Sequence, residues 1–222
     1  MAEKVFPRGH LIAIDGSRGK DVSAAADALA ARLRRGGVES VISRWDASGL
    51  FGELAQAGRP GGQVSPRTLS LVYAADLAFR LRWEIRTTVE TGGVVIAAPY
   101  VETAAAFASA CGLPGGWLRD LLRFAPAAHV RGIVRERKGD RGWKPRLDRG
   151  YCEYGAALFE EATADFKSKQ ARQAMIKVLA AERGRKVFQL SGKGIDQAAK
   201  AVIGSRPAAA TQSASRRRNE RT

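Results

Sequence analysis

The sequence predicts a three-layer α/β domain in which helices flank a central parallel sheet. Short apolar runs of strand length alternate along the chain with longer segments of helical period. Strand–helix–strand units of this kind fold with a right-handed crossover, which makes their two strands parallel. The chain has 222 residues, of which 45% are hydrophobic, so it is long enough to bury one core and too short for two large ones.

The first such unit lies between residues 10 and 42. The apolar run His10–Asp15 is typical of a buried strand, and Val38–Ile42 is expected to form the second strand. A helix is predicted between them over Ser23–Arg35, where apolar residues recur at helical spacing. We expect Ser23 to cap this helix and the pair Gly36-Gly37 to end it.

The remaining apolar runs extend this pattern to the end of the predicted domain, residues 1–204. A basic loop is expected at residues 135–150, and a basic, disordered tail at 205–222. Further strands are predicted at Val94–Ala97, Val130–Val134 and Lys186–Leu190, and further helices at 67–91, Val101–Ala110, Gly116–Phe124, 151–183 and Ile195–Ile203.

Charge is unevenly distributed along the chain and favours an anionic partner. The net charge is +15, and residues 131–222 hold +12 of it. No apolar run approaches the roughly 20 residues of a membrane-spanning helix. The two cysteines are too few for a disulfide framework, and His10 and His129 are far apart in the sequence, so a zinc site is not expected. These observations favour a cytoplasmic protein without a membrane partner.

The turn Asp15–Asp21 lies where a phosphate-binding loop would lie, between the first strand and its helix. Its glycines allow backbone N–H groups to face a phosphate, and Lys20 would reach the terminal phosphates of ATP. Against the motif G-x-x-x-x-G-K-[ST], Gly19-Lys20 matches, the first glycine falls on Ile14, and Asp21 replaces the hydroxyl that binds Mg²⁺. An ordinary turn with exposed cations is the alternative interpretation.

Several short motifs, in order, resemble the thymidylate kinase family over about residues 10–203. The family's E-G-x-D-G-x-G-K-[ST] corresponds to the turn at Asp15–Asp21, and its R-E-P-G-G to the segment that begins at Arg44. Its F-A-A-D-R helix appears as YAADL from Tyr73, and its D-R-Y as APY ending at Tyr100. The longest match is its G-L-x-x-x-W-L…L-x-x-F-A stretch, here residues 112–125. The resemblance implies a P-loop NTPase-type fold, ATP and Mg²⁺ as cofactors, dTMP as acceptor and a homodimer.

The resemblance also assigns roles to individual residues. It makes Lys20 and Arg44 catalytic and Asp21 the metal ligand, and it places the cofactor on Gly16, Ser17, Arg18, Gly19, Lys20 and Asp21. The acceptor nucleotide would bind Arg44, Tyr73, Asp76 and Tyr100, with Tyr73 stacked on the base. Three charged groups of the family are missing, because Leu77 replaces an arginine and Ala98-Pro99 replaces an Asp-Arg pair.

Three interpretations follow from these matches and losses. In the first, the chain is a degenerate thymidylate kinase-like protein that binds nucleotides with little or no kinase activity, since phosphoryl transfer depends on positioned charge. In the second it is an active nucleoside monophosphate kinase, in which Asp21 holds Mg²⁺ and the arginines of a lid at 135–150 replace those lost. In the third, residues 131–222 form a basic module that binds nucleic acid or an acidic protein, and the tail contacts polyanions non-specifically.

Overall fold

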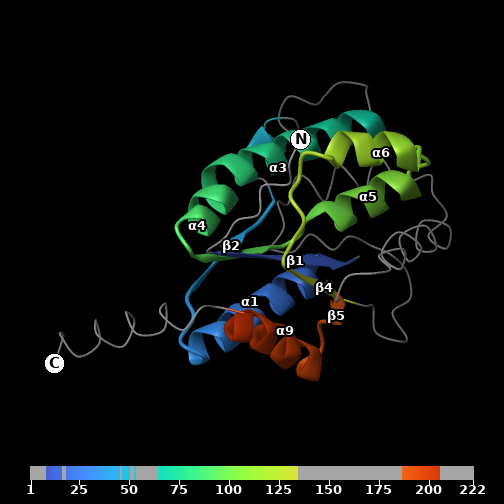
Figure 1. Ribbon diagram of the computed structural model, residues 1–222. Coiled ribbons are helices and arrows are strands. Elements are labelled where there is room, and N and C mark those ends of the chain that lie inside the picture. Colours follow the sequence, from blue (N-terminus) through green and yellow to red (C-terminus); the bar gives the residue numbers. More distant parts are fainter. Residues whose placement is uncertain are drawn as a thin grey trace.

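A computed structural model describes residues 9–16, 19–45, 47–50, 53, 65–134 and 187–205 of the chain. Within these ranges, five parallel strands form one sheet in the order β2-β3-β1-β4-β5 (Figure 1). The strands are β1 (His10–Gly16), β2 (Ser40–Ser43), β3 (Val94–Ala97), β4 (Val130–Val134) and β5 (Val187–Gln189). This arrangement confirms the predicted α/β sandwich of P-loop NTPase type.

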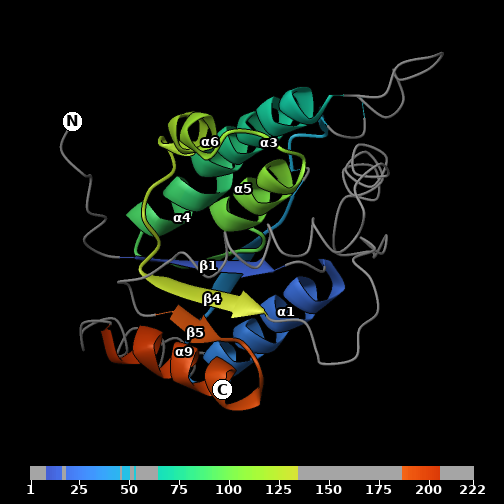
Figure 2. The same cartoon turned by 90° about the vertical axis from the view of Figure 1, so that its right-hand side faces the viewer.

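Helices cover both faces of the sheet and make three layers. One face is covered by α1 (Gly19–Arg35) and α9 (Gly192–Ser205), which pack against each other. The other face is covered by α5 (Val101–Ala110), α6 (Gly115–Leu122) and a long helical rod (Figure 2). The rod consists of α3 (Pro66–Arg80), a π-helical turn η1 (Leu81–Ile85) and α4 (Arg86–Glu90).

Strand β1 holds the sheet together because it pairs with β3 on one side and with β4 on the other. Four consecutive residues, from Leu11 to Ile14, are at most 1% exposed. Strands of a parallel sheet are buried on both faces, so a continuous apolar run suits this position. The chain leaves β1 through α1 on one face and leaves β3 through α5 on the other. The connections therefore diverge between the carboxyl ends of β1 and β3, which is where ligands bind in open α/β sheets.

Most predicted elements agree with the structure, whereas α1 and β2 begin at residues other than those predicted. β3, β4 and α5 have the predicted bounds. Helix α1 begins at Gly19, four residues before the expected start, so Ser23 lies inside the helix and is not its cap. β2 begins at Ser40, two residues later than expected. The predicted helix 151–183, the basic loop and the tail after Ser205 lie outside the described residues. None of the helices described here is long and apolar enough to cross a membrane.

Candidate functional site

A buried carboxylate joins the carboxyl end of β1 to the start of α5. Oδ1 of Asp15 accepts hydrogen bonds from the backbone N–H of Tyr100 (3.0 Å), the backbone N–H of Thr103 (2.9 Å) and the Thr103 hydroxyl (2.7 Å). The Gly16 N–H is bonded to the same hydroxyl at 3.2 Å. Amides at a helix N-terminus attract negative charge, and here the protein supplies that charge itself.

The environment of Asp15 shifts its titration toward neutral pH. Burial, together with the nearby Glu102 carboxylate, raises the pKa of Asp15 to about 6, against the lowering effect of the bonds from Thr103 and Tyr100. Glu102 is paired with Arg131 of β4. The carboxyl edge of the sheet therefore contains a carboxyl group that changes its charge near pH 6.

A buried guanidinium joins the carboxyl ends of β2 and β3. Arg80 of α3 is 0% exposed, and it donates to the Ser43 hydroxyl, the Ser43 carbonyl and the Pro99 carbonyl, each at 2.9 Å. The Ser43 hydroxyl in turn donates to Glu84 at 2.5 Å. Asp76 Oδ2 lies 4.0 Å from Nη1 of Arg80, and within the described part of the chain that nitrogen has no hydrogen-bond partner. The charge of Arg80 is thus used to hold two strand ends together.

The aromatic residues expected to hold the acceptor base are buried against the protein's own side chains. Tyr73 is 1% exposed, and its ring meets that of Trp45 edge to face, with centroids 4.2 Å apart. Phe107 of α5 closes the cluster, 6.1 Å from the Trp45 ring. The Tyr73 hydroxyl donates to the carbonyl of Tyr100 (3.3 Å), and the Tyr100 hydroxyl donates to the carbonyl of Pro126 (2.8 Å). Burial raises the pKa of Tyr100 well above its usual value.

The two charged residues expected near the acceptor also have protein partners. Oδ1 of Asp76 accepts from the backbone N–H and the hydroxyl of Ser48, at 3.0 and 2.9 Å. Arg44 donates to the hydroxyl of Ser23 at 2.8 Å and forms an ion pair with Asp27 at 2.7 Å. Arg44 therefore points along α1, whereas Asp76 anchors the segment that follows β2.

The structure describes both ends of the predicted phosphate loop. β1 ends at Gly16 and α1 begins at Gly19, and Ser17 and Arg18 between them lie outside the described residues. The motif G-x-x-x-x-G-K-[ST] has four residues between its glycines, so its first glycine falls on Ile14, inside β1. A Cβ on Gly16 would lie 2.8 Å from the Val22 side chain and 3.0 Å from the Val134 carbonyl, so close packing explains this glycine.

The first turn of α1 contains two residues of the predicted cofactor site, Lys20 and Asp21. Lys20 lies in the first turn of α1, but its side chain lies outside the described residues, as do the predicted lid and most of the tail. Asp21 is a partly exposed residue of the same turn. Across the described ranges, no group of three or more metal-ligating side chains occurs.

The sequence does not single out Asp15 and Arg80, whose hydrogen bonds join the elements at the carboxyl edge of the sheet. Asp15 was noted only as the start of the turn, and Arg80 was not singled out. A polar residue at the end of an apolar strand is a usable signal for Asp15. Arg80 follows Leu77 by three residues and therefore continues the buried face of the helix, but its partners follow only from the packing of the rod on β2 and β3.

Curated proteins similar to this chain are thymidylate kinases. A thymidylate kinase of Xylella fastidiosa is 32% identical over 130 residues, which is 59% of this chain and 60% of that protein. A probable thymidylate kinase of Thermococcus gammatolerans is 32% identical over 126 residues, 53% of this chain and 61% of that protein. A thymidylate kinase of Bifidobacterium longum subsp. infantis is 28% identical over 184 residues, 80% of this chain and 77% of that protein.

These similarities support a thymidylate kinase-like family for the chain. Its match to the Xylella and Thermococcus proteins spans about 60% of their length. No protein-family model matches the sequence.

The buried carboxylate gives the first testable prediction. Asp15→Asn keeps an oxygen for the three donors and removes the titrating charge. The folded-state pKa of Asp15 is raised from 3.8 to about 6, so the wild type loses stability as the pH rises through this interval. We expect the free energy of unfolding of Asp15→Asn, relative to wild type, to increase by about 3 kcal/mol between pH 4 and pH 7 in urea titrations.

Asp15→Ala is the matched control for this measurement. It leaves the amides of Tyr100 and Thr103 without their acceptor, so it should be less stable than Asp15→Asn at every pH, by about 2 kcal/mol or more. A relative stability of Asp15→Asn that falls with rising pH would contradict the assignment.

Proposed function

We propose that this chain, which is thymidylate kinase-like in sequence and fold, binds nucleotides but has lost most of its ability to phosphorylate dTMP with ATP. The observation that carries the proposal is the carboxyl end of β3. The family has an Asp-Arg pair there, whereas this chain has buried Ala98 and Pro99. Leu77, 0% exposed, replaces a third charged residue on α3. Phosphoryl transfer is catalysed mainly by positioned charge, and one arginine contributes about a thousandfold or more.

The remaining cations do not replace the missing ones in the described part of the chain. Arg44 is paired with Asp27, and Arg80 holds the carbonyls of Ser43 and Pro99. Both guanidinium groups are therefore engaged with groups of the protein itself.

Thymidylate kinases in general use ATP and Mg²⁺, and the residues after β1 fit that pair poorly. The first glycine of the phosphate-binding motif falls on Ile14, which lies within β1 and pairs with Gly132 of β4, so the backbone at this position belongs to the sheet. Asp21 places a carboxylate where the motif has a hydroxyl, and a carboxylate repels the polyphosphate. We therefore derive no transfer step through Mg²⁺ and ATP.

Trp45 supports the same proposal at the acceptor side. The resemblance makes Tyr73 the residue that stacks on the nucleotide base. In this structure the Trp45 ring contacts Tyr73 edge to face, with the ring centroids 4.2 Å apart, and is only 5% exposed. An indole in contact with Tyr73 competes with a pyrimidine for the same aromatic surface.

The loss of activity is tested by a coupled assay with ATP, Mg²⁺ and dTMP. We expect turnover about a thousandfold or more below the roughly 1–100 s⁻¹ of ordinary kinases. The thymidylate kinase of Xylella fastidiosa is the positive control, and Lys20→Ala identifies any residual turnover that comes from a contaminant. Turnover of tens per second in the wild type would refute the proposal.

The position of Trp45 predicts a gain of binding on substitution. Trp45→Ala should bind dTMP at least tenfold more tightly than wild type in calorimetry, because it exposes the Tyr73 ring. Removing a buried tryptophan costs about 3–5 kcal/mol of stability, so the smaller change Trp45→Leu accompanies it. Trp83→Ala removes a tryptophan that is 58% exposed and should leave dTMP binding unchanged. Equal affinity in wild type and both Trp45 variants would show that Trp45 does not block the base.

A homodimer is part of the proposed function, and the helical rod offers a surface for it. Leu71, Ala75, Phe79 and Trp83 follow one another at intervals of four residues, so they line one face of the rod. The three large side chains are 49%, 38% and 58% exposed, and the Phe79 and Trp83 rings are 6.5 Å apart. Such a stripe buries itself by packing against the same stripe of a second copy.

The dimer is tested by sedimentation velocity at micromolar concentration. The wild type should sediment as a dimer and Trp83→Glu as a monomer, because the glutamate would place a charge inside the interface. Phe124→Glu is the control, since Phe124 is similarly exposed (39%) but lies after α6, outside the stripe. A monomeric wild type, or equal dissociation of both variants, would exclude this interface.

A further inference from the structure

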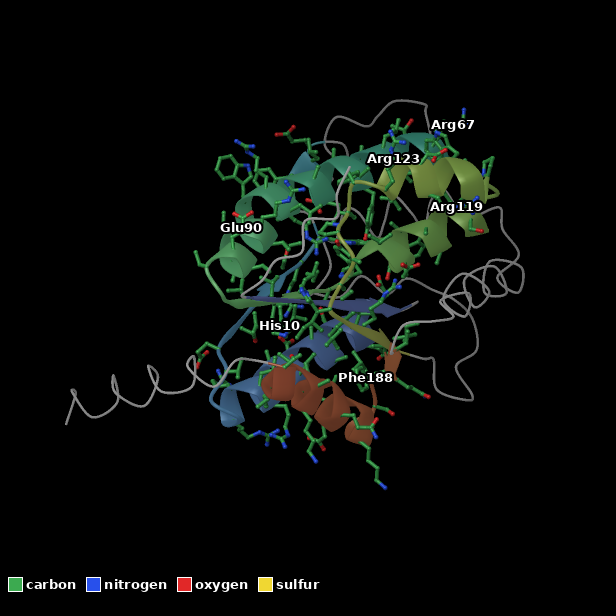
Figure 3. The ribbon with its side chains drawn as sticks, viewed as in Figure 1. His10, Arg67, Glu90, Arg119, Arg123 and Phe188 are labelled. Carbon is green, nitrogen blue, oxygen red and sulfur yellow. The ribbon has the colours of Figure 1, made fainter. Side chains whose placement is uncertain are left out.

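The two histidines of the chain meet at the edge of the sheet opposite the candidate site. His10 is the first residue of β1, and His129 immediately precedes β4. They are 119 positions apart in the sequence, yet their ring centroids lie 5.3 Å apart. The pairing of β1 with β4 therefore brings together two histidines whose distance in the sequence predicted that they would not share a site. Figure 3 labels His10 at the start of the sheet.

The hydrogen bonds of His129 determine which of its ring nitrogens carries a proton. Nδ1 of the His129 ring accepts a hydrogen bond from the backbone N–H of Leu11 at 3.0 Å, and the backbone N–H of His129 donates to the Leu11 carbonyl at 2.9 Å. An acceptor nitrogen has no proton, so the neutral ring carries its proton on Nε2. Burial lowers the pKa of His129, which also favours the neutral ring.

His10 is joined to the end of α9 by a second set of contacts. The Ser205 hydroxyl lies 3.0 Å from the Val202 carbonyl oxygen, which is one acceptor for its proton. The same hydroxyl lies 2.7 Å from Nε2 of His10, and which of these two atoms donates depends on the tautomer of the ring. This bond joins the last residue of α9 to the first residue of β1.

The same proton positions argue against a metal between the rings. A metal bound to Nε2 of His129 would require the ring proton to move to Nδ1, where the Leu11 N–H already points. The arrangement instead suits two imidazoles that remain neutral while the protein is folded.

We propose that His10 and His129 form an acid-sensitive latch between the end of α9 and the start of the sheet. Protonation of His129 places a second N–H against the Leu11 amide and breaks that bond. Protonation of His10 adds another cation 5.3 Å away, so the two imidazolium rings repel each other. Acid therefore loosens the start of β1 and the last turn of α9, which leads into the basic tail.

Charged groups on the surrounding elements are mostly basic. Arg34 and Arg35 end α1, whose neighbouring Gly36 packs on Ile203 of α9, and Lys200 lies on α9 itself. On β4, Arg131 is paired with Glu102. Glu90 ends α4, beside Gly9, whose Cβ would meet the Val89 carbonyl. The lowered pKa of His129 comes from its burial.

Nuclear magnetic resonance tests the latch directly, because only two imidazole spin systems are present in the chain. At pH 7.5 we expect the His129 ring to be neutral with its proton on Nε2. The protection of the Leu11 amide against hydrogen exchange should fall by up to tenfold per pH unit once His129 titrates, relative to the Ile96 amide of β3. The stability carried by the neutral rings is present above the unfolded-state pKa of about 6.5 and is lost below it.

Two conservative variants separate the latch from general acid unfolding. His129→Asn offers an amide oxygen to the Leu11 N–H without titrating, and His10→Gln keeps an N–H for Ser205. In the double variant, Leu11 protection relative to the Ile96 amide should be independent of pH between 5 and 7.5. Titration of Asp15 lowers the stability as the pH rises, which is opposite to the effect of the histidines. Because Asp15 is present in both the wild type and the double variant, its effect cancels when the two are compared.

Three outcomes would overturn the inference. They are a wild-type His129 ring that carries its proton on Nδ1 at pH 7.5, Leu11 protection that does not change with pH in the wild type, and an equal fall in the double variant. The first of these is measured on the wild type alone, so a variant that fails to fold does not remove the test.

Discussion

The candidate site depends on one carboxylate. Asp15 satisfies the first amides of α5 through Oδ1, and it does so from the strand at the centre of the sheet. This contact fixes α5 against the end of β1 and thereby places Phe107 against Trp45. It also neutralises a helix N-terminus that would otherwise attract an anionic ligand. The interaction that organises the site therefore removes one of its ways of binding phosphate.

The fold was largely predictable because its signals are local. β3 and β4 are apolar runs bounded by glycine, polar residues or proline, and a buried parallel strand needs little else. The start of α1 was not predictable in this way, because Gly19 and Lys20 read as a loop while Ser23 is a good cap residue. Tertiary packing of Val22 against β1 and β4 decides where the helix begins.

The sequence predicts which residues lie at the site, but it does not predict which side chains contact one another there. The positions of Tyr73 and Asp76 on one helix follow from the sequence, but their partners Trp45 and Ser48 come from the segment after β2. Helical periodicity distinguishes Arg80, which continues the Tyr73 and Leu77 face of α3, from the exposed Arg82. It does not give the partners of Arg80, the carbonyls of Ser43 and Pro99, because these depend on how the rod packs on the sheet.

Loss of charge at the carboxyl edge is consistent with retention of the fold. A buried catalytic charge is costly to the folded state, because it is removed from water without a full set of partners. Leu77 and Ala98 are buried apolar residues in contact with the core, so they add hydrophobic stabilisation where a kinase would have strained charge. Asp76 and Arg80 persist as buried charges because each has structural partners: Ser48 for Asp76, and Ser43 and Pro99 for Arg80. The charges that remain in the described part of this edge are therefore those that hold its elements together.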